Sequence, residues 1–243
     1  MTVVGSYKNN NFIFVHIPKN GGCSVAKALL PYVWSPNLSY VYDSLHEFLP
    51  KYIRSSIKSL FSLQGNPKTF LAREYLRKFK GIKVPHMSAK EIRDFLGKDF
   101  YNKSFVFAIA RNPYTREVSR FKFVKKRKDH PSNKLFSSFK DFNDFVNFRY
   151  EKYKQGDNIT QKSFLIDNKG NQIVDQYIKL ENINKDFEEI IKKLGLPSNL
   201  SIPHLNKTRG KTIWADYYSK ESFNKIREIC SEDFEFFNYD KSF

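Results

Sequence analysis

The stretch that decides the fold is a buried strand followed by a glycine turn and the start of a helix, Phe12-Ile13-Phe14-Val15-His16-Ile17-Pro18-Lys19-Asn20-Gly21-Gly22-Cys23-Ser24. Its first six residues are almost continuously apolar, which is typical of a parallel strand buried on both faces. Pro18 ends the strand because proline cannot donate a hydrogen bond to the sheet. Gly21 and Gly22 then turn the chain, and residues 24–30 predict a helix that stops at Pro31.

A second apolar run shows the same succession of strand, turn and helix. Residues 105–110 form the strand, and the turn Arg111-Asn112-Pro113 follows it. Proline suits the first turn of a helix, so we expect a helix from Pro113 to about Val124. Strands that alternate with helices indicate an α/β fold.

The rest of the chain is read mainly from helical periodicity. Ser88 and Glu91 match a capping box, and Gly97 is suited to end the helix that they open. Residues 164–174 predict two short strands around a turn. Other helices are expected at about residues 45–79 with a break at 65–67, 139–153, 186–194 and 219–237. We therefore predict an α/β fold with a P-loop-like central parallel sheet flanked by helices, as a single domain over residues 1–243 with a helical insertion at about 45–80.

The charge of the chain is strongly positive. Lys and Arg number 42 against 25 Asp and Glu, which gives a formal net charge of +17. Such an excess favours polyanionic partners, namely nucleic acid, acidic lipid, phosphorylated cofactors or acidic glycans. General solubility explains many of the lysines equally well, so charge alone does not choose among these partners.

Cysteine usage and hydropathy bear on the cellular compartment. Cys23 and Cys230 have neither a zinc-like spacing nor a disulfide framework, so we expect two free thiols in a reducing compartment. No apolar run approaches the roughly 18 residues of a membrane span. The first residues also lack a signal-peptide pattern. The expected location is the cytoplasm, of a bacterial-type enzyme, unless an anchor precedes the chain.

The loop at residues 18–24 has the composition of an anion site. Loop amides and a helix N-terminus present N–H groups to an anion, Ser24 adds a hydroxyl, and Lys19 adds a full positive charge. Lys19 precedes the glycines, so the loop does not match the P-loop pattern GxxxxGK[ST], and the dinucleotide pattern GxGxxG is also absent. Taken alone, the loop is also compatible with an ordinary strand-to-helix turn.

Arg111 and Ser119 strengthen the interpretation as a phosphate site. Ser119 follows Arg111 by about two helical turns, so both side chains are expected to reach the same phosphate. Taken singly, Arg111 is equally well explained as a surface arginine and Ser119 as a solvated helix serine.

The two segments together resemble a known family. Residues 16–24 and 110–119 are similar to the two donor-binding signatures of carbohydrate sulfotransferases, in the branch of the heparan and chondroitin enzymes and their bacterial relatives. The resemblance implies an enzyme that uses 3′-phosphoadenosine 5′-phosphosulfate (PAPS) and releases adenosine 3′,5′-bisphosphate (PAP). It extends over roughly residues 12–30, 84–124 and 163–240.

The resemblance also implies roles for individual residues. The first signature holds the 5′-phosphosulfate through Lys19, Asn20, Gly21, Gly22, Cys23 and Ser24. The second holds the 3′-phosphate through Arg111 and Ser119, assisted by Lys207 and Thr208. The family usually has threonine at the position of Asn20 and often at Cys23, so these positions keep their backbone amides but lose the threonine hydroxyl. We interpret Cys23 at the helix N-terminus as a structural substitution and not as a nucleophile.

Sulfuryl transfer needs in-line geometry, cations and a base for the acceptor hydroxyl. No carboxylate cluster for a divalent metal is evident, so we expect no metal requirement and assign the positive field to Lys19 and the loop amides. Histidine is the expected base near neutral pH. The resemblance implies His86, because a histidine in this place serves as the base in related enzymes. His204 is the alternative, while His16, His46 and His130 are expected to be packed or solvated.

The acceptor is the least visible part of the reaction. Residues 125–128 are basic and suit an acidic sugar or a peripheral contact with acidic lipid, although such runs are more often solvated faces. We predict a sulfotransferase that acts on a hydroxyl of a carbohydrate or glycolipid. The alternatives are a P-loop-like kinase, which requires a lysine after the glycines, and a basic nucleic-acid-binding protein, which requires a recognition module. The sequence shows neither feature.

Overall fold

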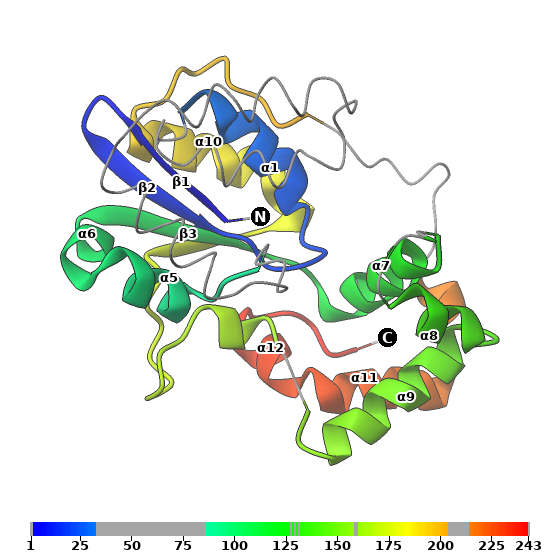
Figure 1. Cartoon of the computed structure of the whole chain (residues 1–243). Coiled ribbons are helices and arrows are strands. Elements are labelled where there is room, and N and C mark those ends of the chain that lie inside the picture. Colours follow the sequence, from blue (N-terminus) through cyan, green and yellow to red (C-terminus); the bar gives the residue numbers. More distant parts are fainter. Residues whose placement is uncertain are drawn as a thin grey trace.

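A four-stranded sheet organises the chain (Figure 1). The computed structural model describes residues 2–32, 86–126, 128, 130, 132–157, 160–203 and 214–242. The strands lie in the order β1-β2-β3-β4, with bounds Val3–Tyr7, Asn10–Val15, Ser104–Ala110 and Gln176–Lys179. β2, β3 and β4 are parallel to one another, and β1 is antiparallel to β2. The predicted α/β fold with a mostly parallel sheet is confirmed.

The edge strand β1 was not predicted from the sequence. It joins β2 through a tight hairpin in which Lys8 and Asn9 both have positive φ, at 46° and 68°. Two such residues in succession make the mirror-image turn that matches the twist of paired strands. The first ordered strand of the chain is therefore β1, and the predicted strand at residues 12–17 corresponds to β2.

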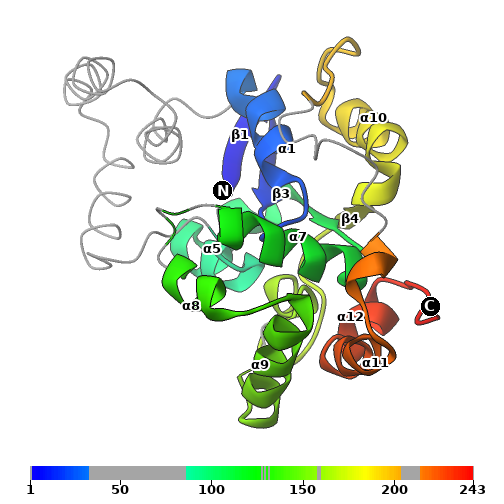
Figure 2. The ribbon, with the colours of Figure 1, turned by 90° about the vertical axis from the view of Figure 1, so that its right-hand side faces the viewer.

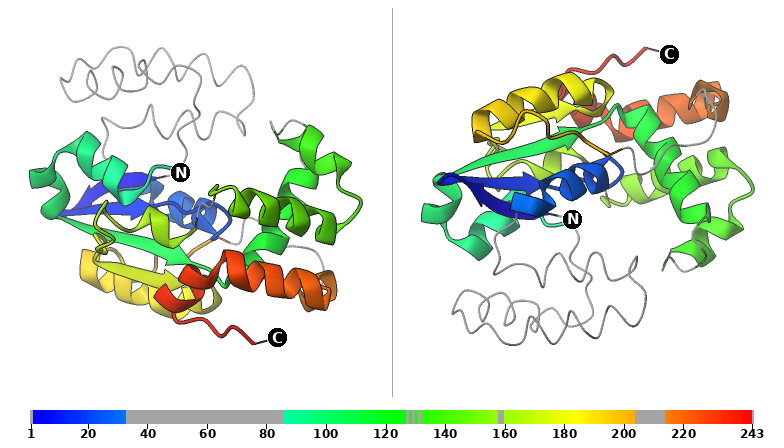
Figure 3. Two further views of the ribbon diagram at one scale, coloured as in Figure 1. Left: turned by 90° about the horizontal axis from the view of Figure 1, so that it is seen from below. Right: turned by 90° about the horizontal axis from the view of Figure 1, so that it is seen from above.

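The two faces of the sheet are covered by different helices. Alternate residues of β2 point to opposite faces, so Phe12 and Phe14 belong to one buried cluster and Ile13 and Val15 to another. Figures 1 and 3 show α1 (Gly22–Leu29) and α10 (Ile183–Leu194) over the first face, and α5 (Ala89–Leu96) and α6 (Lys98–Asn102) over the second.

The other α-helices of the described residues gather at one end of the sheet, beyond the carboxyl end of β3 (Figures 1 and 2). They are α7 (Pro113–Lys126), α8 (Asn133–Ser138), α9 (Phe142–Lys154), α11 (Lys220–Ile229) and α12 (Ser231–Phe236). Their core is rich in aromatic rings: Tyr114 packs at 4.4 Å from Phe223 and at 5.5 Å from Trp214, between ring centroids. This aromatic core fixes the orientation of α7, which carries Ser119.

Most predicted boundaries in the described residues are close to the observed ones. Ser88 and Glu91 form the predicted capping box, and Gly97 ends α5. Gly195 ends α10 with a left-handed φ of 65°. Short 3-10 helices occupy Leu30–Tyr32, Lys162–Phe164, Leu180–Asn182 and Trp214–Tyr217.

Three local predictions are corrected. Residues 164–174 contain one isolated bridge instead of two strands, because the Asp167 carboxylate accepts the N–H groups of Lys169 and Asn171 and closes a turn. The final helix is broken at Cys230. The helix expected from residue 139 begins at Phe142, because the Asp141 side chain caps it, and α8 precedes it as a separate helix.

The predicted helical insertion at about 45–80 lies outside the described residues. Within the described parts of the chain, no helix has the length and apolar content that would let it cross a membrane.

Candidate active site

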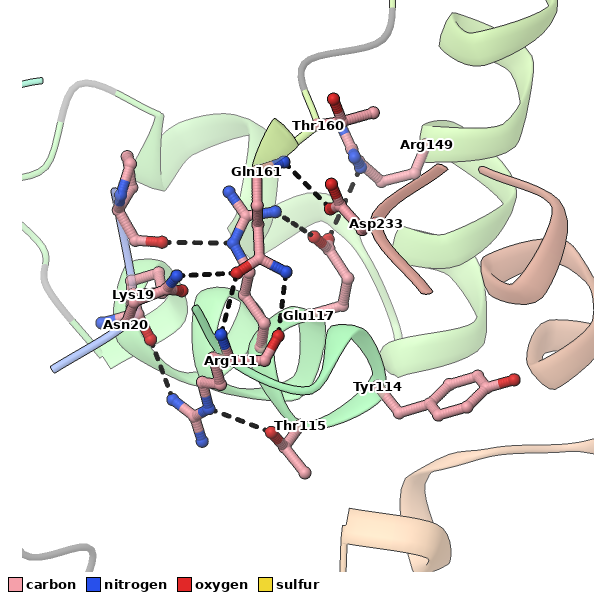
Figure 4. A network of polar contacts seen from close by, with 12 residues as sticks. Lys19, Asn20, Arg111, Tyr114, Thr115, Glu117, Arg149, Thr160, Gln161 and Asp233 are labelled. Atoms are coloured by element: carbon pink, nitrogen blue, oxygen red, sulfur yellow. Dashed lines mark hydrogen bonds and ion pairs between the residues drawn. The ribbon is translucent and has the colours of Figure 1, made fainter. Parts of the chain in front are cut away.

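The loops that follow β2 and β3 meet at the carboxyl edge of the sheet (Figure 4). We call residues 18–23, which include the first two residues of α1, the β2 loop, and residues 111–112 the β3 loop. The Arg111 guanidinium donates to the Lys19 carbonyl at 3.0 Å and to the Thr115 hydroxyl at 3.0 Å. The Arg116 guanidinium donates to the Pro18 carbonyl at 3.2 Å. The two predicted donor-binding segments therefore lie against each other, as expected for neighbouring parallel strands.

The β2 loop leaves several backbone donors available. Lys19 and Gly21 adopt left-handed φ values of 71° and 75°, and α1 begins at Gly22 with no acidic residue in its first turn. The Ser24 amide is used by the Gly21 carbonyl at 3.1 Å. Among the described residues, the N–H groups of Gly21, Gly22 and Cys23 have no acceptor. Unpaired amides at the start of a helix suit a phosphate or sulfate group, so this loop fits the 5′ end of a donor such as PAPS.

The two glycines of this segment are required by packing. A Cβ at Gly22 would lie 1.9 Å from Cδ2 of His16, and one at Gly21 would lie 2.6 Å from Cδ1 of Leu180. The sequence analysis attributed these glycines to close approach of the ligand. The structure adds a second reason, since the protein itself fills the space on the inner side of each glycine.

Asn20 supports the loop from inside. Its side chain is buried, and its Nδ2 atom donates to the Ile109 carbonyl at 2.6 Å and to Oε1 of Gln161 at 2.6 Å. The Asn20 amide lies 3.4 Å from the Ile17 carbonyl. Asn20 was predicted to contact the donor through its backbone amide, but the structure shows that its polar groups mainly anchor the β2 loop to β3.

The β3 loop, in contrast, uses its backbone groups internally. The Arg111 N–H and C=O both pair with the Gln161 side chain, and the Asn112 N–H donates to Oε1 of Glu181 at 2.9 Å. Oδ1 of Asn112 caps α7 by accepting from the amides of Tyr114 and Thr115. The charged group that this loop offers a ligand is the Arg111 guanidinium, which also donates to the Lys19 carbonyl through Nη1 and to the Thr115 hydroxyl through Nε.

Ser119 is half-buried on α7, in keeping with its predicted place about two turns beyond Arg111. Ser24 is also half-buried, and Cys23 is exposed. Both cysteines are free, as predicted, and burial raises the pKa of the Cys230 thiol.

A buried ion-pair network lies behind the two loops. Glu117 is fully buried on α7, and its carboxylate lies 3.6 Å from Nη1 of Arg116 and 3.5 Å from Nε of Arg149. Burial alone raises the pKa of Glu117, but the charges of Arg149, Arg120 and Arg116 outweigh it and lower the pKa overall. Glu117 therefore stays ionised and holds Arg116, which in turn holds the Pro18 carbonyl.

His86 lies beside the β2 loop. Its ring centroid is 4.7 Å from that of His16, whose ring packs against Gly22. Although one side of the residue faces solvent, partial burial and nearby positive charges, among them Arg116 and Lys19, lower the pKa of His86 to about 3. His86 is therefore neutral at pH 7 and able to accept a proton. His16 is a packed residue, as predicted, and it positions the ring of His86.

Lys19 has an aromatic neighbour on α7. Its Nζ atom lies 3.6 Å from the ring centroid of Phe123, a residue that is 37% exposed. The Phe123 ring also meets the edge of His130 at 5.9 Å. The predicted basic run is only partly a loop, because Lys125 and Lys126 form the last turn of α7. An exposed aromatic ring and several lysines thus adjoin the cation of the β2 loop.

Three residues considered for the site, His204, Lys207 and Thr208, lie outside the described residues, as does His46, which was expected to be solvated. Sequence reasoning did not find Gln161, which lies in a segment without a recognisable motif. It also assigned no role to Glu117, although this residue lies within the second signature at residues 110–119. Among the described residues, no group of three or more His, Cys, Asp or Glu side chains is arranged to hold a metal ion.

A strand, a loop with unpaired amides and a helix, beside a second strand that is followed by an arginine, form an α/β arrangement suited to an anionic ligand such as a nucleotide. The sequence model of the sulfotransferase family matches residues 7–240, so the chain belongs to that family. An uncharacterised protein of Archaeoglobus fulgidus is 30% identical over 119 residues, which cover 48% of this chain and 88% of the relative.

A structural comparison gives a more distant likeness. The crystal structure of mouse sulfotransferase SULT7A1 complexed with PAP aligns with a TM-score of 0.44 and 16% identity, and the alignment covers 95% of each chain. The family assignment rests on the match over residues 7–240. It confirms the predicted enzyme class, a PAPS-dependent sulfotransferase.

Proposed function

We propose that the chain transfers a sulfuryl group from PAPS to a hydroxyl of a carbohydrate or glycolipid. The single observation that supports this assignment best is the pairing of unlike groups at one sheet edge. Unpaired amides and Lys19 follow β2, and the Arg111 guanidinium follows β3. This pairing suits a nucleotide that carries an anionic group at both its 5′ and 3′ ends.

The residues of the β2 loop would stabilise the leaving group. PAPS supplies a sulfuryl group joined through oxygen to a 5′-phosphate, and transfer leaves negative charge on that oxygen. Donors fixed in advance at such a position lower the barrier, because they need no reorganisation during the reaction. The amides of Gly21, Gly22 and Cys23 are fixed by the start of α1, and Lys19 adds a positive charge.

His86 would take the proton of the acceptor hydroxyl. It is neutral at pH 7 and faces solvent on one side. Its ring contacts that of His16, which places it beside the β2 loop. An acceptor oxygen that attacks sulfur from the side opposite the leaving group needs a base on that side. A bound donor adds negative charge near His86, which raises its pKa and makes it a stronger base.

The acceptor is proposed to approach over α7. Phe123 offers an exposed ring for the apolar face of a sugar, and the exposed side chains of Lys125, Lys126 and Lys128 follow it. These positive charges favour an acidic saccharide or an acidic lipid surface.

The test is transfer of labelled sulfate from PAPS to a panel of neutral and acidic saccharides and glycolipids. We expect PAP to bind without magnesium and sulfate to move to at least one saccharide hydroxyl. No PAP binding would contradict the donor site, and transfer only to non-carbohydrate hydroxyls would contradict the acceptor class.

A further inference from the structure

One buried carboxamide connects the two loops of the donor site. Gln161 precedes the short 3-10 helix Lys162–Phe164 and is 0% exposed. Its Oε1 atom accepts the Arg111 N–H at 3.0 Å, and its Nε2 atom donates to the Arg111 carbonyl at 2.8 Å. The same Oε1 atom accepts Nδ2 of Asn20 at 2.6 Å. Figure 4 shows Gln161 between Asn20 of the β2 loop and Arg111 of the β3 loop.

Gln161 is itself held from the helical side of the molecule. Asp233 of α12 accepts the Gln161 N–H at 2.9 Å through Oδ2 and the Lys162 N–H at 2.9 Å through Oδ1. Asp233 is fully buried, so water does not compete for these bonds. Gln161 is therefore fixed both through its backbone N–H and through its side-chain amide.

The hydrogen bonds of Gln161 join the two loops where the pairing of β2 with β3 has already ended. β2 and β3 are paired only up to Val15 and Ala108, and the chains separate beyond that point. The residues proposed to contact the donor come after the separation. Among the described side chains, Gln161 is the one that hydrogen-bonds to both Asn20 and Arg111, while Arg111 itself reaches Lys19.

We propose that Gln161 is a positioning residue that fixes the spacing between the 5′ and 3′ halves of the donor site. The role rests on the donor site proposed above. A ligand that spans both loops gains affinity only if the loops are already at the correct separation. The affinity of a ligand that reaches only one loop does not depend on that separation. Gln161 thereby sets selectivity for a nucleotide with a 3′-phosphate, without touching it.

The test compares two ligands on one variant. Gln161→Met keeps the length and volume of the side chain but removes all three hydrogen bonds of its amide. We expect PAP to bind at least tenfold more weakly to this variant by calorimetry, while adenosine 5′-monophosphate, which lacks the 3′-phosphate, changes less than threefold by ligand-observed NMR. Gln172→Met is the matched control, because Gln172 is exposed and donates to a backbone carbonyl, that of Val174.

A second variant covers poor folding of the first. Asn20→Ala removes the Nδ2 bonds to Gln161 and to the Ile109 carbonyl but leaves both bonds between Gln161 and Arg111 in place. It should lower PAP affinity in the same selective way, by about threefold to tenfold. PAP affinity within threefold of the wild type in both variants overturns the role of Gln161. Equal weakening of both nucleotides also overturns it, because general loosening of the site would act on each. A wild-type protein that does not bind PAP contradicts the donor site itself, which is a separate result.

Discussion

The β2 loop and the β3 loop occupy equivalent places in the sheet but offer a ligand different chemistry. Each follows a parallel strand and leads into a helix. The β2 loop leaves the amides of Gly21, Gly22 and Cys23 unpaired among the described residues, whereas the β3 loop uses its backbone groups within the protein. One loop therefore offers a ligand its backbone amides, and the other offers the Arg111 side chain. Equivalent topology does not imply equivalent recognition.

The difference has a physical cause in the turn residues. The backbone is left-handed at Lys19 and Gly21, and the N–H groups of Gly21, Gly22 and Cys23 have no acceptor among the described residues. Turns of this kind are typical of anion-binding loops. At the β3 loop, the Asn112 side chain caps α7 and satisfies the amides that would otherwise face a ligand. Substitutions in the two loops should consequently have different effects, and the predictions below run from the largest effect to the smallest.

The first prediction assigns the chemical step to the side of the β2 loop. His86→Ala should reduce turnover by about 10²–10⁴-fold, the usual contribution of a general base. PAP affinity should change less than about threefold, because His86 is not proposed to bind the nucleotide. Steady-state kinetics with an identified acceptor and calorimetry with PAP would measure the two effects. His130→Ala is the comparison, and a larger loss of turnover in that variant would contradict the assignment.

The second prediction concerns the pKa of His86. In the free protein this pKa is about 3, below the value of an unfolded histidine, so the unfolded chain binds the proton first. His86 therefore destabilises the free protein as pH falls from about 6.5 toward 3. Bound PAP brings negative charge near the ring and should raise the pKa by about one to three pH units. Ring chemical shifts followed over pH with and without PAP would show this, and identical titrations would contradict the placement of His86.

The third prediction tests the contrast between backbone and side-chain recognition directly. Arg111→Ala removes the ligand-facing group of the β3 loop and should weaken PAP binding by about 10–100-fold, the value of one or two charge-assisted hydrogen bonds. Lys19→Ala leaves the loop amides in place and should weaken it by no more than about tenfold. Calorimetry at fixed salt is the measurement, and exposed Arg227→Ala controls for net charge. A stronger effect at Lys19 would reverse the comparison.

The fourth prediction concerns the packing of the β2 loop. A methyl group at Gly22 collides with the His16 ring, so Gly22→Ala should cost about 1–3 kcal/mol of stability. It should also weaken PAP binding, by roughly threefold to tenfold, because the unpaired amides shift. The double variant His16→Ala with Gly22→Ala removes the collision and should recover PAP affinity. Thermal unfolding and calorimetry test both parts, and failure of the double variant to recover would point to ligand contact at Gly22 instead.

The smallest effect is expected at Phe123. The Lys19 ammonium lies over this ring, and a partly exposed cation–π contact contributes about 0.5–1 kcal/mol. Phe123→Ala releases Lys19 toward the donor and should tighten PAP binding by about twofold to fivefold. Leu135→Ala on α8 is the control, because Leu135 is a second exposed apolar residue. Weaker PAP binding in Phe123→Ala would show that the ring supports Lys19 in its binding position.

The sequence predicted the elements that carry a local signal. The apolar strand at residues 105–110, the capping box at Ser88 and the glycine that ends α10 are each set by residues close in sequence. β1 was not predicted, because a five-residue edge strand with a central glycine has little alternation of apolar and polar residues. The break between α11 and α12 at Cys230 was also not predicted, because no proline or glycine marks it in the sequence.

The sequence by itself determined the succession of strand, loop and helix, the two signature segments and the family, because these depend on residue types at short spacing. Only the tertiary structure decided which groups in those segments remain available to a ligand. Gln161 lies 50 residues from Arg111 and 141 from Asn20, so no local pattern relates them. Glu117 on α7 and Arg149 on α9 form another pair that no local sequence pattern relates. Hydrogen bonding and burial between distant segments, and not the motifs alone, leave unpaired backbone amides in one loop and only the Arg111 guanidinium in the other.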